Sequence, residues 1–162
     1  IRLCGVALAW FLTTSHRFLR DRTTKALVNL FTDRIHVLQV LMQQFLDVND
    51  PYVLERLLAV AYGCTLRSVN DDAIGALAQA VYDWVFRNGK PPVHILSRDY
   101  ARGVIEYALH RGIELDVEVD MIKPPYQSEW PPDIPEQEQN LRKGKAKSCS
   151  SMLETTTRNS RT

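Results

Sequence analysis

Two stretches, RDRTTKALVNL at residues 20–30 and RDYARGVIEYAL at residues 98–109, give the strongest indication of the fold. Each begins with an Arg-Asp pair, has a basic residue about one turn later (Lys25 and Arg102) and continues with an apolar run. Their starts lie 78 positions apart, which is twice 39. Apolar residues that recur every three or four positions are typical of helices with one buried face. The two stretches therefore predict equivalent helices in a repeated helical unit.

A third stretch lies about halfway between them. DPYVLERLLAVAY at residues 50–62 has the same helical character, shifted in phase. Repeats of roughly 40 residues with two helices each are typical of HEAT and armadillo arrays. We therefore expect an all-α fold, an α-solenoid of HEAT-like helix pairs over residues 1–112. An irregular helical bundle is the alternative.

Capping residues set the expected helix boundaries. The Asp50-Pro51 pair is a strong helix start, because the carboxylate can accept an unpaired backbone N–H and proline fits the first helical position. Gly112 suits a helix end. The first four expected helices cover residues 3–12, Ser15 to about 31, Thr32 or Asp33 to about 45, and 50 to about 67. A fifth begins at Asn70, Asp71 or Asp72 and stops at Gly89. A sixth follows Pro91-Pro92 and reaches His110 or Arg111.

The spacing of apolar residues along each expected helix predicts which side chains form the core. In the second helix the expected apolar side consists of Phe18, Leu19, Ala26, Leu27 and Leu30. The residues predicted to be buried across the helix pairs are Leu27, Leu38, Leu57, Val60, Leu77, Val81 and Ile105.

The pattern changes after the last expected helix. Residues 113–119 (IELDVEV) alternate as a strand does, but a lone strand must pair elsewhere or serve as an extended connector. Several prolines then exclude helix, so residues 113–135 are expected to form an extended Pro/aromatic connector that packs on the helices. Residues 136–162 are polar and mildly basic, and we expect a disordered tail.

The connector contains Tyr126 and Trp130 between its prolines, and two roles are open for it. It can lie free as a polyproline ligand for a partner's aromatic groove. It can also run back along the helices as a brace, with both aromatic rings buried. The brace is favoured, because Tyr and Trp bury large areas at little entropic cost.

Composition limits the classes of function. The net charge of +1 gives no support to nucleic acid or membrane as partners. Three widely spaced cysteines without a CxxC pair favour a reducing, cytoplasmic compartment. The apolar residues 3–12 are too short for a membrane span, which needs about 20 residues. They are expected to be a buried first helix, and a signal-peptide remnant is the alternative.

No motif for catalysis is present. The chain lacks GxxxxGK[ST], GxGxxG, HExxH and GxSxG, and its four histidines do not pair with cysteines at metal-ligand spacing. Cys64 lies on an apolar face, where a small core residue is expected rather than a nucleophile. We therefore expect no enzymatic activity, no cofactor and no metal. An enzyme whose site is assembled from distant residues is the alternative.

The candidate residues for binding a protein partner are charged or aromatic. The two Arg-Asp stretches can form a basic ridge for a protein or a nucleic acid. Pairing within each helix, Asp21 with Lys25 and Asp99 with Arg102, is the favoured interpretation, because mixed signs weaken the field that a phosphate backbone requires. The candidates are Arg20, Arg22, Arg98, Arg102, Tyr126 and Trp130.

Four segments of the sequence together resemble a known protein family. SHRFLRDRTTKALVNL (15–30), DPYVLERLLAVAYG (50–63), HILSRDYARGVIEYAL (94–109) and PPYQSEWP (124–131) are similar to the helical-repeat region of large bacterial STAND-type ATP-binding proteins, which resemble NACHT-like antiphage defence NTPases. The resemblance covers about residues 15–135. It implies a sensor segment of a larger cytoplasmic ATPase that contacts other domains of the same chain or a foreign protein. It implies no ATP site in these residues, and the tail from about Leu141 departs from it.

Overall fold

Helices account for all the regular structure in residues 1–48 and 50–129, the part of the chain that the computed structural model describes. This agrees with the expected all-α class. The predicted tail, residues 136–162, lies outside the described residues. The elements are α1 (Arg2–Trp10), η1 (Phe11–Thr13), α2 (Arg17–Phe31), α3 (Ile35–Phe45), α4 (Pro51–Arg67), α5 (Asp71–Val85), α6 (Ile95–His110) and η2 (Val119–Ile122), where η marks a short 3₁₀ helix.

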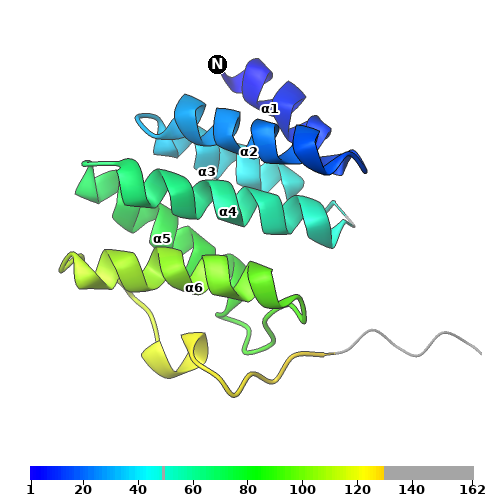
Figure 1. Ribbon diagram of the computed structural model, residues 1–162. Helices are drawn as coiled ribbons and strands as arrows, with labels where there is room; N and C mark the ends of the chain where they lie inside the picture. The colour runs from blue at the N-terminus through cyan, green and yellow to red at the C-terminus, as the bar shows by residue number, and fades with distance from the viewer. Residues whose placement is uncertain (49, 130–162) are drawn as a thin grey trace, which may run out of the picture. The chain divides into compact units, whose positions relative to one another are not determined.

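The helices of residues 1–129 lie in two rows (Figure 1). In the front row, α2, α4 and α6 lie side by side, each packed against the next. Behind them, α3 contacts α4 and α5, and α5 packs on α6. Helix α1 packs on α2 and α3. The chain thus passes back and forth between the rows, so that each front helix covers the apolar side of a rear helix.

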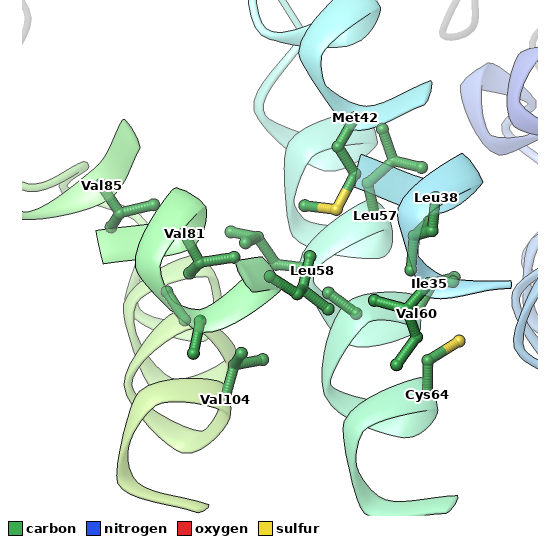
Figure 2. Close-up of a cluster of buried hydrophobic side chains, with 14 of the residues drawn as sticks. Ile35, Leu38, Met42, Leu57, Leu58, Val60, Cys64, Val81, Val85 and Val104 are labelled. Atoms are coloured by element: carbon green, nitrogen blue, oxygen red, sulfur yellow. The ribbon is translucent and has the colours of Figure 1, made fainter. Parts of the chain in front are cut away.

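The core runs between the two rows. Figure 2 shows part of it, in which Leu38 and Met42 of α3 lie beside Leu57 of α4. Full burial of such a side chain stabilises the fold by about 1.5–3 kcal/mol. The seven residues predicted to be buried across the helix pairs are all at most 1% exposed, which confirms these positions as core: Leu27, Leu38, Leu57, Val60, Leu77, Val81 and Ile105.

Three helix boundaries agree with the predicted caps. Asp50 Oδ1 accepts from the N–H of Tyr52 at 2.9 Å, and Asn70 Oδ1 accepts from that of Ala73 at 3.1 Å. Helix α6 ends at His110 and is followed by Gly112 at φ 78°. The amides of Gly112 and Ile113 donate to the carbonyls of Leu109 and Ala108, which is the Schellman arrangement that glycine favours.

Other predicted caps are wrong. His16, not Ser15, caps α2, and its Nδ1 accepts from the N–H of Leu19 at 3.3 Å. Neither Thr32 nor Asp33 caps α3, which starts after Arg34 without a side-chain cap. Thr32 instead ends α2 and donates its hydroxyl to the Val28 carbonyl. Gly89 is not at the end of α5, because the helix stops at Val85 and Gly89 lies in the turn that follows.

The N-terminal helices are more exposed than expected. Phe18 is 60% exposed and Leu19 39%, and Ala26 is also exposed, so the predicted apolar side of α2 is wrong at these positions. The buried positions are four residues apart instead, at Thr23, Leu27 and Phe31. Helix α1 buries only Gly5 and Ala9, so it is not the buried first helix that its composition suggested.

The connector after α6 has no regular structure before η2 (Val119–Ile122), a 3₁₀ turn that the extended-connector prediction did not include, and no strand occurs in the described residues. Gln79 of α5 explains why the connector needs no strand partner. Its Oε1 accepts from the N–H of Asp116 at 2.9 Å, and its Nε2 donates to the Asp116 carbonyl at 3.1 Å. The alternating pattern has a packing role as well: Ile113, Leu115 and Val117 are half-buried against the helices, whereas Val119 is exposed.

Candidate binding surface

The candidate residues fall into two separate groups. Arg20 and Arg22 lie on α2, whereas Arg98 and Arg102 lie on α6, and α4 lies between these helices in the front row (Figure 1). Tyr126 follows η2 and contacts the second group. Trp130 lies outside the described residues. The structure therefore brings Arg98 and Tyr126 together and keeps the α2 residues apart from them.

Arg20 is held across the start of its helix. Its Nη1 donates to the carbonyl of Thr14 at 3.3 Å, which fastens the preceding loop to α2. Its guanidinium carbon lies 5.9 Å from the ring centroid of Tyr52, in the first turn of α4. A cation at this distance from an aromatic face is attracted to the ring. Arg20 therefore joins two neighbouring front helices.

Arg98 repeats this arrangement with Tyr126. Its Nη1 donates to the carbonyl of Pro92 at 3.3 Å and to Ser128 Oγ at 3.2 Å. Its guanidinium carbon lies 4.8 Å from the ring centroid of Tyr126. The other neighbour of that ring is Phe86, at 6.2 Å between centroids, and the Tyr126 hydroxyl donates to the Ile122 carbonyl at 2.8 Å.

Arg22 and Arg102 are engaged within their own helices. The guanidinium of Arg22 lies 4.5 Å from the ring centroid of Phe18, one turn earlier on α2. Arg102 lies 3.5 Å from a carboxylate oxygen of Asp99 and 3.7 Å from one of Glu106. The predicted Asp99–Arg102 pair is thus confirmed. Arg22 is exposed and Arg102 is partly exposed, and weak surface pairs of this kind can be exchanged for contacts with a partner.

The predicted pairing of Asp21 with Lys25 is wrong. Asp21 Oδ1 accepts from Nη1 of Arg56 in α4 at 2.8 Å, and Oδ2 lies 3.9 Å from Nε of Arg17. The physical reason is that helix α4 supplies a planar guanidinium at the place where Lys25 offers only a flexible ammonium. The charge cluster of α2 thus connects neighbouring front helices.

A buried carboxylate lies between α4 and α6 that the sequence pattern did not predict. Glu55 of α4 is only 5% exposed. One of its oxygens lies 3.5 Å from Nε of Arg56, and the other lies 3.8 Å from Nε2 of His94, the N-cap residue of α6. His94 Nδ1 in turn lies 3.3 Å from the hydroxyl of Ser97, which is buried. With Ser97 enclosed, this group fits a junction between α4 and α6 better than a hydrolytic site.

One feature of the sequence indicates where the histidine of this junction lies. His16 and His94 both precede an Arg-Asp pair by four residues, at the same 78-residue offset. In the structure both histidines are N-cap residues of front helices. Glu55 itself gave no signal, because an acidic residue in a helix is ordinarily solvated and its burial depends on how α4 and α6 pack.

Cys64 behaves as the expected core residue. Its side chain is fully buried in α4 (Figure 2), and burial raises the pKa of the thiol to about 12. The thiolate, which is the nucleophilic form, is therefore scarce at neutral pH.

A shallow hollow lies beside Tyr126. Its volume is about 320 Å³, and its walls come from the turn after α5 and from the connector. The residues that line it are Gly89, Pro91, Asp120, Met121, Pro125, Tyr126 and Gln127.

Two structural findings bear on ligands and membranes. Within residues 1–48 and 50–129, no three His, Cys, Asp or Glu side chains come together as a metal site would require. Among the described helices, none combines the length and the hydropathy of a membrane-spanning helix.

No family model matches the chain, and neither a curated protein nor a solved structure is significantly similar to it.

Proposed function

We propose that this chain is an α-solenoid segment of HEAT-like helix pairs that recognises proteins, and that it belongs to a larger STAND-type NTPase of bacterial antiphage defence. The NTPase chemistry resides elsewhere in such a protein, and this segment contributes binding. The recognised partner is a foreign protein or another domain of the same chain.

One observation carries the proposal. The 78-residue offset in the sequence corresponds to equivalent positions in space: Arg20 and Arg98 each stand fourth in a front helix and each donate to a carbonyl six residues earlier, at 3.3 Å. A repeated local contact of this kind is what stacked units of a repeat array require, since each unit contacts its neighbours in the same way. The alternation of front and rear helices supports the same conclusion.

The exposed side chains fit protein recognition. Aromatic and arginine residues are enriched at the centres of protein interfaces. The front row offers Phe18 at 60% exposure with Arg22 over its ring, and Tyr52 at 57% exposure with Arg20 over its ring. Such exposed aromatic–arginine pairs can enter a partner's pocket at small entropic cost.

Nucleic-acid binding is the alternative, and the charges support it less. Several basic side chains of the front row lie close to carboxylates, as Arg56 does to Asp21 and Arg102 to Asp99. Paired cations release few counterions on meeting a phosphate backbone, so they contribute little affinity.

A binding panel tests the proposal. The purified chain is titrated against individual purified phage proteins and against DNA and RNA oligonucleotides at low and high salt. We expect at least one phage protein to bind with an affinity that falls about tenfold or more in the Phe18→Ala/Arg22→Ala variant, while the matched variant Asp72→Ala on α5 binds as wild type. Salt-sensitive oligonucleotide binding with no protein partner would overturn the proposal in favour of the alternative.

A further inference from the structure

Connector residues 125–129 lie in a site next to the last front helix, α6. We call this site the seat, and it is formed by Phe86, Lys90 and Arg98. The base of the seat is Phe86, which is fully buried and lies next to the Tyr126 ring. Arg98 also lies over that ring, with its guanidinium carbon 4.8 Å from the ring centroid, and donates to the hydroxyl of Ser128. Lys90 closes the far end by pairing with Glu129. The seat thus recognises an aromatic ring, a hydroxyl two positions later and a carboxylate three positions later.

The same recognition unit occurs a second time in the molecule. Arg20 is anchored to a loop carbonyl as Arg98 is, and it also lies over a tyrosine that directly follows a proline, Tyr52 after Pro51. In each arginine the Nε is buried and has no hydrogen-bond partner within residues 1–48 and 50–129. Two independent occurrences show that an anchored arginine over a Pro-Tyr pair is a favourable arrangement in this fold.

The two occurrences differ in how firmly the tyrosine is held. Tyr52 belongs to α4, a helix of 17 residues with a buried face, so it cannot leave without unfolding that helix. Tyr126 belongs to a segment beyond η2, a helix of only four residues, and its neighbours Pro125 and Gln127 are exposed. The hollow of about 320 Å³ beside Tyr126 leaves room for the segment to shift. Only the second seat can therefore exchange its occupant.

We propose that the seat formed by Phe86, Lys90 and Arg98 is a peptide-binding site for an extended Pro-Tyr segment of a partner protein, and that residues 125–129 occupy it in cis. The partner segment carries a hydroxyl or another acceptor two positions after its tyrosine and a carboxylate three positions after it. This deepens the proposed function by naming one partner class, and it rests on that function being protein recognition.

Tethering explains how such a site is controlled. A segment joined to its own binding site by a short connection acts at an effective concentration of the order of millimolar. A free peptide with the same contacts therefore competes poorly until the tethered segment is weakened or a partner supplies further contacts elsewhere on the surface. The connector then limits binding to partners that engage more than one site.

Fluorescence anisotropy with a labelled synthetic peptide KPPYQSE, the sequence of residues 123–129, tests the proposal on the full chain. We expect weak binding to wild type and binding about tenfold tighter or better to Tyr126→Ala, in which the cis segment has lost its anchor. Adding Arg98→Ala to that variant should abolish the gain, and a peptide with alanine in place of tyrosine should not bind. The matched control adds Arg20→Ala, which removes the equivalent arginine of α2, and should leave the gain intact.

Charge exchange adds a second readout, which tests the carboxylate position of the segment and not the tyrosine ring. Lys90→Glu in the Tyr126→Ala background should reject KPPYQSE and accept KPPYQSK. The proposal is overturned if folded Tyr126→Ala binds no better than wild type, or if the charge exchange has no effect. It is also overturned if Tyr126→Ala fails to fold, since the segment is then a permanent brace. None of these outcomes affects binding of phage proteins at other surfaces, so failure here is distinguishable from failure of the proposed function.

Discussion

Arg56 of α4 donates to Asp21 of α2 with 2.8 Å between Nη1 and Oδ1, while its Nε lies 3.5 Å from a carboxylate oxygen of the adjacent Glu55. One guanidinium thus serves a partly exposed carboxylate on the neighbouring helix and a buried carboxylate on its own. These two roles have different energetic weight, because an exposed ion pair contributes little whereas a buried charge without a partner is costly.

The difference predicts unequal effects of removing the two partners. Asp21→Ala should lower the free energy of unfolding by only about 0.5 kcal/mol. Arg56→Ala should lower it by about 1–3 kcal/mol, because the buried Glu55 carboxylate loses the guanidinium that lies 3.5 Å from it. Urea unfolding followed by circular dichroism measures both values, and Arg17→Ala, at an 87% exposed side chain, is the control. Equal losses for the two variants would contradict the role assigned to Glu55.

The position of Leu57 in the core predicts that replacing it with alanine causes a large loss of stability. Its side chain is 1% exposed and packs between α3 and α4 (Figure 2), so Leu57→Ala should cost about 2–5 kcal/mol through lost contacts and a cavity. Leu66→Ala on the same helix, where the side chain is 45% exposed, should change stability by about 0.5 kcal/mol or less. Thermal and urea melts of the two variants provide the comparison. Similar losses at both positions would show that the phase of α4 is wrong.

A close approach between front helices predicts the effect of Gly103→Ala. A Cβ at Gly103 of α6 would lie 2.9 Å from a ring carbon of Tyr62 in α4. Alanine would otherwise favour the helix by about 1 kcal/mol. We therefore expect Gly103→Ala to destabilise wild type by forcing the tyrosine aside, and to stabilise the Tyr62→Ala background. A double-mutant cycle measures this change of sign, and an effect that is identical in both backgrounds would rule out the contact.

Much of the helical framework could be predicted from sequence because its signals are local. Asp50, Asn70 and Gly112 mark helix ends through bonds to residues at most four positions away, and the buried face of α4 follows from spacing alone. The partner of Asp21 could not be predicted in this way. Choosing Arg56 over Lys25 requires knowing that α2 and α4 lie side by side, which no local pattern contains. The same holds for Phe86, the base of the Tyr126 seat, which lies 40 positions earlier in the sequence.

Burial of Cys64 predicts how stability depends on alkaline pH. The pKa of this thiol is raised from 9.0 to about 12 in the folded protein, chiefly by burial. The unfolded chain therefore loses the proton near pH 9 while the folded chain keeps it, so this contribution to stability is complete below pH 9 and is lost between about pH 9 and 12. Cys64→Ala should weaken that decline, apart from a pH-independent loss of packing.

Thiol alkylation gives an independent measurement of the same burial. With iodoacetamide at pH 8, peptide mapping should show Cys4, which is exposed, modified rapidly and Cys64 only after addition of denaturant. Rapid labelling of native Cys64, or a pH profile unchanged by Cys64→Ala, would contradict the enclosed thiol.

The connector after α6 provides a test of how a segment without a strand partner is held. Gln79 satisfies both the N–H and the carbonyl of Asp116, and Arg87 adds a bond to the Asp116 carboxylate at 3.2 Å. Gln79→Ala removes the two backbone bonds and should cost about 1 kcal/mol, since each exposed bond contributes little net stability. The exchange rate of the Asp116 amide should change more than the free energy of unfolding of the whole protein, because this amide loses its acceptor. Hydrogen–deuterium exchange should therefore accelerate at Asp116.

A charge variant at the same position sharpens this test. Gln79→Glu keeps an acceptor for the Asp116 N–H but loses the donor to its carbonyl, and it places a third carboxylate beside Asp83 and Asp116, with Arg87 between them. We expect this variant to be less stable than Gln79→Ala at low salt and to recover as salt screens the repulsion. The amide of Ile113, which donates to the Ala108 carbonyl within the end of α6, is the internal control and should exchange at the wild-type rate in both variants. Should Asp116 keep its protection when Gln79 is replaced, the remaining contacts of the connector, among them the Arg87–Asp116 pair and the packing of Leu115 and Val117, hold it, and the glutamine bonds are incidental to its path.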